Sequence, residues 1–206
     1  MHTHASGRQG GRAQELRRRI AVEAARLMSE HGIRDFHLAK RKAAERLGAG
    51  EDVALPKNSE IEDALREHQR LFLADEQPQL LRRLREVARE AMRFFAQFEP
   101  RLVGSVLEGT ADRHSAVALH LFSDNPDDVA TFLQEQRIPY EQQTRRVRVA
   151  PDQNDEFPVL LFSADDTALD LTVFPRDAIR QAPIDRVDER PMRRASLAML
   201  EQMLSG

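Results

Sequence analysis

The 206-residue chain contains no cysteine. Disulfides and thiolate metal sites are therefore excluded, and the sequence gives no sign of an oxidising compartment. It also has no run of 18 apolar residues, and its first residues lack the apolar core of a signal peptide. Hydrophobic residues nevertheless make up 41% of the chain, enough for a core. We therefore expect a soluble globular protein of the cytoplasm, without a membrane anchor.

The sequence has no internal repeat either, and its hydrophobic period changes near Pro100. Before that point, apolar residues recur at helical spacing, which predicts helices at about 12–31, 35–47, 59–72 and 77–98. After it, alternation predicts strands at about 101–107, 116–123, 144–150, 157–164 and 167–174, with helices at 126–136 and 192–204.

An acidic turn at Asp165-Asp166 separates the last two predicted strands, which favours an antiparallel hairpin. The expected fold class is α+β. A helical N-terminal region, about 1–98, would pack on a mixed β-sheet domain of about 99–206.

Charge is distributed unevenly along the chain. Residues 1–50 hold 11 Lys and Arg against 5 Asp and Glu, whereas the whole chain holds 31 against 34. A basic segment on an acidic body is typical of binding to an anionic partner, and Lys40, Arg41 and Lys42 are the candidate nucleic-acid contacts. The same charge is also consistent with a solvated helix face.

The basic helices have two further interpretations. The segment from Arg19 to Gly48 resembles the opening of a TetR-type regulator, although a third, recognition helix is not evident before the linker that follows. A helical cover that delivers a nucleic-acid acceptor to the sheet would carry the same charge.

The strand predicted at 116–123 has two unlike faces. Val117, Leu119 and Leu121 share one face, because side chains alternate along a strand, and we expect that face to be buried. Ala116, Ala118 and His120 share the other face.

A Gly-Ser pair, Gly104-Ser105, precedes this strand by about ten residues, and Asp170 stands between two leucines on a later strand. In order and spacing, these residues resemble the nucleotidyltransferase superfamily of the DNA polymerase β type. The resemblance covers about 100–175. It implies that Gly104, Ser105, Arg113 and Ser115 contact the nucleotide, and that Asp170 is the third catalytic carboxylate and a Mg²⁺ ligand.

The chain departs from the family pattern at two positions. The family places acidic residues where this sequence has Ala116 and Ala118, and a methyl group cannot bind a metal. Three explanations remain open: an engineered replacement of both carboxylates, a naturally degenerate member, and an accidental resemblance.

The resemblance implies a parent activity that moves an NMP from an NTP to an acceptor, either nucleic acid or protein, with Mg²⁺. The partners would be NTP and RNA or another acceptor, and the chain as written would be inactive because of Ala116 and Ala118. The alternative function is a non-catalytic nucleic-acid-binding or regulatory protein that retains the fold.

Overall fold

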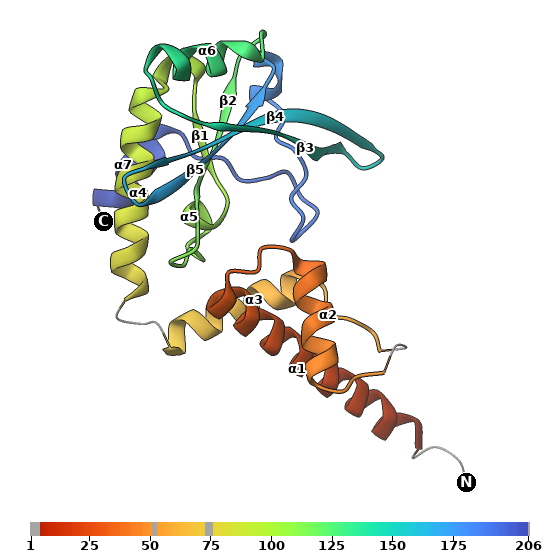
Figure 1. The fold of residues 1–206 in the computed structure, drawn as a ribbon. Helices are drawn as coiled ribbons and strands as arrows, with labels where there is room; N and C mark the ends of the chain where they lie inside the picture. The colour runs from red at the N-terminus through yellow and green to blue at the C-terminus, as the bar shows by residue number, and fades with distance from the viewer. Residues whose placement is uncertain (1–4, 51–52, 73–75, 206) are drawn as a thin grey trace. The chain divides into compact units, whose positions relative to one another are not determined.

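The computed structural model describes residues 5–50, 53–72 and 76–205. The chain forms two compact units, each with its own hydrophobic core. The helical unit comprises the described part of Met1–Ala74 together with Arg186–Asp188, and the sheet unit comprises the described part of Asp75–Asp185 with Glu189–Gly206. Figure 1 shows the elements of both units.

The helical unit consists of α1 (Ala5–His31), α2 (Phe36–Arg46) and α3 (Asn58–Phe72). The Gly32 that follows α1 has a φ of +66°, a left-handed conformation that favours glycine at a helix end. Asp35 caps α2 by accepting the Leu38 N–H at 2.8 Å. Apolar side chains spaced three and four apart then pack the three helices together, with Ile20, Leu27 and Ile61 fully buried.

The sheet unit begins with α4 (Gln77–Phe94), so the unit boundary lies before this helix and not at residue 98. The remaining elements are η1 (Ala96–Phe98), β1 (Arg101–Val103), α5 (Ser105–Glu108), β2 (Val117–Phe122), α6 (Asp127–Glu135), β3 (Glu141–Ala150), β4 (Gln153–Ala164), β5 (Thr167–Phe174), η2 (Arg176–Ile179) and α7 (Leu197–Ser205). The α+β class expected from the sequence is confirmed.

The five strands form one sheet in the order β1-β2-β5-β4-β3. β2 and β5 are parallel, and every other neighbouring pair is antiparallel. The predicted hairpin is confirmed as β4 and β5, with Asp165 at a φ of +50° in its turn.

One face of the sheet, here called the core face, is buried against helices. As expected, Val117, Leu119 and Leu121 are buried there. They belong to the same cluster as Met92 of α4 and Leu200 of α7. Figure 1 shows α4 and α7 side by side, and they are in contact.

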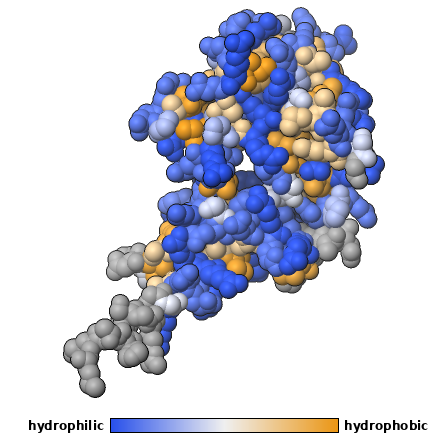
Figure 2. Space-filling view, turned by 180° about the vertical axis from the view of Figure 1, so that it is seen from behind, coloured by the Kyte–Doolittle hydropathy of each residue, from blue (hydrophilic) through white to orange (hydrophobic). Residues whose placement is uncertain are grey.

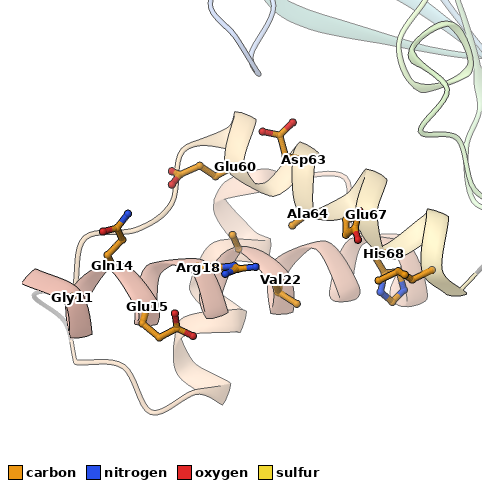
Figure 3. Close-up of a pocket in the computed structure, with 12 residues that line it drawn as sticks. Gly11, Gln14, Glu15, Arg18, Val22, Glu60, Asp63, Ala64, Glu67 and His68 are labelled. Carbon is orange, nitrogen blue, oxygen red and sulfur yellow. The ribbon is translucent and has the colours of Figure 1, made fainter.

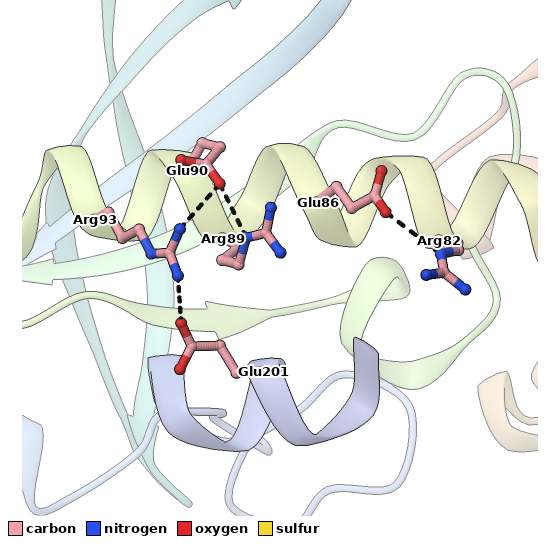
Figure 4. Close-up of polar contacts among 6 residues, drawn as sticks. All are labelled: Arg82, Glu86, Arg89, Glu90, Arg93 and Glu201. Atoms are coloured by element: carbon pink, nitrogen blue, oxygen red, sulfur yellow. Dashed lines mark hydrogen bonds and ion pairs between the residues drawn. The ribbon is translucent and has the colours of Figure 1, made fainter. Parts of the chain in front are cut away.

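The outer surface of α4 carries a row of ion pairs, which explains its many arginines (Figure 4). Arg82 pairs with Glu86 one helical turn away, and Arg93 bridges Glu90 and Glu201 of α7 at 3.3 and 2.7 Å. These groups are largely exposed, so each pair contributes at most about 1 kcal/mol. Apolar packing on the inner side of α4 is therefore the main source of its stability.

Two boundaries differ from the sequence prediction. Ser105–Glu108 form the short helix α5, so the strand expected over 101–107 ends at Val103. The last helix begins at Leu197 and not at 192, because Ala195 exchanges two backbone hydrogen bonds with Leu102, each 2.9 Å long.

This exchange covers the outer edge of β1. At the opposite edge of the sheet, Ile184 donates its N–H to the Arg148 carbonyl of β3 at 2.7 Å.

Within the described residues, no helix is both long and apolar enough to cross a membrane. Figure 2 shows hydrophilic residues over most of the face seen there, with hydrophobic residues in small separate areas.

Candidate functional site

The face of the sheet opposite the core face is here called the site face; it includes Ala118 and His120 of β2 and Asp170 and Thr172 of β5. Ala118 is the register partner of Asp170. Because neighbouring strands lie about 4.8 Å apart, the two side chains are adjacent.

Gly104 lies against the same place. Its φ of +72° and ψ of −158° fall in a region that is essentially restricted to glycine. A Cβ built on Gly104 would stand 3.7 Å from the Ala118 Cβ, so the backbone here passes directly beside Ala118. The structure thus brings together Gly104, Ala118 and Asp170, three of the positions that the sequence singled out.

The other predicted positions lie around this group. Ser105 opens α5 directly after Gly104, and Ala116 is half-buried just before β2. The buried Ser115 closes a turn, because its hydroxyl donates to Asp112 Oδ1 at 3.2 Å and accepts the Asp112 N–H at 2.9 Å. The exposed Arg113 donates to His114 Nε2.

Arg145 of β3 is a site residue that the sequence did not indicate. Its Nη1 and Nη2 donate to Asp170 Oδ1 and Oδ2 at 3.0 and 2.7 Å, and Nη1 also donates to Thr172 Oγ1 at 3.0 Å. Such a two-point contact between a guanidinium and a carboxylate is strong and fixes both side chains. Asp170 is therefore neutralised by a cation from the same chain.

The residues at this position do not fit a Mg²⁺ ion. Ala116 and Ala118 offer no oxygen, and both carboxylate oxygens of Asp170 accept from Arg145. Nowhere in 5–50, 53–72 or 76–205 do three or more histidines or carboxylates gather in a way that could hold a metal. The donor set of the family is absent from the chain as written.

His120 is buried next to the Arg145–Asp170 pair, with 6% of its surface exposed. Burial, followed by the positive charges of Arg194 and Arg145, lowers its pKa to about 3. Its Nδ1 accepts the Arg194 Nε–H at 3.0 Å. His120 is therefore neutral at physiological pH, with its remaining proton on Nε2.

Arg194 comes from the segment between η2 and α7 and lies over the site face. Its Nη1 donates to the Ala178 carbonyl at 2.7 Å, and its guanidinium stacks 5.0 Å from Phe122 and 5.4 Å from Phe174. Burial, followed by the charge of Arg101, lowers its pKa to about 10. Its Nη2 is buried and has no hydrogen-bond partner within the described part of the chain.

The basic residues proposed to bind nucleic acid lie on α2 of the helical unit. Arg41 and Lys42 are exposed, whereas Lys40 is half-buried, and this burial lowers the pKa of its ammonium group. The structure therefore presents two of the three predicted contacts directly to solvent.

A groove of about 770 Å³ lies between α1 and α3 of the same unit (Figure 3). Its lining includes the carboxylates Glu15, Glu60, Asp63 and Glu67 together with Arg18. This lining is mainly acidic, so it does not favour a nucleic-acid phosphate.

Comparison with protein-family models, with curated proteins and with solved structures finds no match to this chain. A functional conclusion therefore depends on the geometry of the site face.

Arg145 and Arg194 were not identified from the sequence, because each reaches the site through pairing or packing with distant segments. The only sequence signal was an excess of arginine in 145–148 and 193–194.

Proposed function

We propose that the sheet unit is a nucleotidyltransferase of the DNA polymerase β type whose carboxylate pair has been lost. The parent activity would move an NMP from an NTP to a nucleic-acid or protein acceptor in the cytoplasm. The observation that carries this proposal is the register of two parallel strands. Ala118 lies beside Asp170, and the Gly104 backbone passes beside Ala118, an arrangement that agrees with the family pattern.

In this proposal the chain as written does not catalyse transfer. The family needs carboxylates at 116 and 118 to hold Mg²⁺, and the alanines there cannot bind the ions that neutralise and orient a triphosphate. Arg145 further supports the loss, because both carboxylate oxygens of Asp170 already accept hydrogen bonds from it.

The test restores the missing groups. We expect an Ala116→Asp, Ala118→Asp variant to be less stable than the wild type without metal, because two new carboxylates stand near Asp170. Mg²⁺ with NTP should raise its Tm, and should raise the Tm of the wild type much less. Adding Arg145→Gln should enlarge the effect of Mg²⁺ by releasing Asp170.

The activity assay follows labelled NMP into RNA and protein in a cell extract. We expect incorporation by the restored variant and its loss when Asp170→Asn is added. A restored variant that folds, yet shows neither Mg²⁺-dependent stabilisation nor incorporation with or without Arg145→Gln, would contradict the proposal.

A second candidate function is a non-catalytic nucleic-acid-binding or regulatory protein with the same fold. One observation favours it. The carboxylate of Asp170, which a transferase would use to hold a metal, is paired with Arg145. This candidate predicts RNA binding by the wild-type chain together with no transfer by the restored variant.

A further inference from the structure

Three arginines surround His120 on the site face. Arg101 of β1 is its register partner on one side, and Thr172 of β5 is its partner on the other side. Arg145 donates to that threonine, and Arg194 donates to His120 itself. Arg145 and Arg194 lie near enough to His120 to lower its pKa, and Arg101 lies near enough to Arg194 to lower its pKa, so the three guanidinium groups form a cluster of positive charge on the site face.

The carboxylates of the described residues do not balance this charge. Asp170 is paired with Arg145. Arg101 donates only to the carbonyls of Glu99 and Pro100, both at 3.0 Å. The cluster therefore holds three guanidinium groups against one carboxylate.

Arg194 has no carboxylate partner among the described residues either, since its bonds go to an imidazole and a carbonyl. Leaving a buried N–H without an acceptor is unfavourable, and buried polar groups in proteins are nearly always paired. Its buried Nη2 is thus a charged donor that no acceptor in 5–50, 53–72 or 76–205 satisfies.

The chemistry of the cluster selects the kind of acceptor. Guanidinium groups match the oxygen geometry of phosphates and remain charged when half-buried. His120 is neutral, so its Nε2–H adds a donor and no further charge. In the nucleotidyltransferase family Mg²⁺ neutralises the phosphates, and here the arginines supply positive charge on the face of the sheet that holds Ala118 and Asp170.

We propose that Arg101, Arg145 and Arg194 form a site that binds the phosphate groups of a polyphosphate or nucleotide without a divalent cation. This inference goes beyond the proposed function, because it concerns the chain as written. Binding needs neither the restored carboxylates nor any transfer.

The test measures binding by isothermal titration calorimetry in EDTA at low salt, with tripolyphosphate and ATP as separate probes. We expect saturable binding of tripolyphosphate and an increase in Tm. Equal affinity for the two probes supports recognition of the phosphate chain alone, whereas tighter binding of ATP supports a nucleotide as the ligand. Added Mg²⁺ should not strengthen tripolyphosphate binding.

Two adjacent arginines provide a matched pair of variants. Arg194→Gln should weaken binding about tenfold or more, because it removes a charged donor from the cluster. Arg193→Gln makes the same charge change at a side chain that is 63% exposed and paired with Glu108. This control should alter affinity by less than about twofold.

The proposal is overturned if tripolyphosphate does not bind in EDTA, if binding requires Mg²⁺, or if both variants weaken it equally. Should Arg194→Gln fail to fold, Arg101→Gln tests the same cluster from the half-buried first residue of β1 and should also weaken binding. If the wild type binds tripolyphosphate but the restored variant is inactive, only the proposed function is contradicted. If the restored variant transfers NMP but the wild type does not bind tripolyphosphate, only this inference is contradicted.

Discussion

The helical unit and the site face of the sheet hold their arginines in different environments. In the helical unit Arg17, Arg26 and Arg46 each contact a carboxylate, while Arg18 and Arg19 are exposed to water. On the site face, Arg101 and Arg194 have no carboxylate partner among the described residues, and Arg194 is largely removed from water.

The comparison teaches that an excess of charge along the sequence does not locate an anion site. Residues 1–50 are basic by composition, yet pairing and hydration already satisfy much of that charge. The rest of the chain is acidic by composition, yet it contains the arginines of the site face, whose charge is balanced less completely by carboxylates. Charge acts more strongly where water is scarce, since the effective dielectric constant is lower there.

The largest expected effect concerns His120 and acid. Its pKa of about 3 in the folded protein lies below the ordinary value of 6.5, so between these values the unfolded chain binds more protons. Stability that is complete above pH 6.5 is then lost as the pH falls, by up to about 1.4 kcal/mol per pH unit. Urea denaturation from pH 7.5 to 4.5 should show a smaller loss in His120→Gln.

The exposed His114 provides the control, and His114→Gln should retain the wild-type loss of stability in acid. If His120→Gln follows the wild-type curve over this range, His120 is not held neutral by its burial and the arginines around it.

A smaller effect separates the ion pair of the site face from one on the outer surface of the same unit. A double-mutant cycle for Arg145→Ala and Asp170→Ala should give a coupling of about 1–2 kcal/mol, because the contact is bidentate and half-buried. The same cycle for Arg93 and Glu201, 50% and 42% exposed, should give less than about 0.5 kcal/mol. Equal couplings would remove the distinction between the two environments.

The basic surface of α2 is tested by salt. If Arg41 and Lys42 contact RNA phosphates, replacing both with alanine should reduce the log–log salt slope by about two units. At about 0.3 M salt each lost contact would weaken binding roughly threefold. Lys40→Ala should change the slope less, because Lys40 is half-buried. An unchanged slope in the Arg41, Lys42 variant would mean that these two residues of α2 do not contact RNA phosphates.

The smallest effect is expected at the Arg17–Glu60 pair of the helical unit. Both side chains are partly exposed, 31% and 41%, so Arg17→Ala should lower the free energy of unfolding by less than about 1 kcal/mol. Salt at 1 M should shrink this difference further. A loss above 2 kcal/mol that salt does not change would mean that pairing matters as much here as on the site face.

Much of the fold was predictable because its hydrophobic periods are clear. The alternation of Val117, Leu119 and Leu121 correctly identified the buried face of β2, and the acidic turn correctly identified the β4–β5 hairpin. The strand predicted over 101–107 was too long, because apolar residues in 105–108 suit a short buried helix equally well. The late start of α7 depends on a backbone pairing with β1 that periodicity does not encode.

The candidate site was predictable only in part. Spacing was enough to bring Gly104, Ala118 and Asp170 together, since two parallel strands fix a register. Arg145 lies 25 residues from Asp170 in the sequence and reaches it across β4. Arg194 reaches His120 over 74 residues. Both contacts depend on strand order and chain crossing, which local sequence patterns do not contain.

The backbone exchange between Leu102 and Ala195 has a consequence for the behaviour of the protein at high concentration. An uncovered edge strand is a template for other chains, and self-association through such edges is a common route to aggregation. The segment before α7 occupies the edge of the three-residue strand β1. Loss of the C-terminal segment from Ala195 onward would expose this edge, so a truncated chain would be prone to assemble into oligomers through β1.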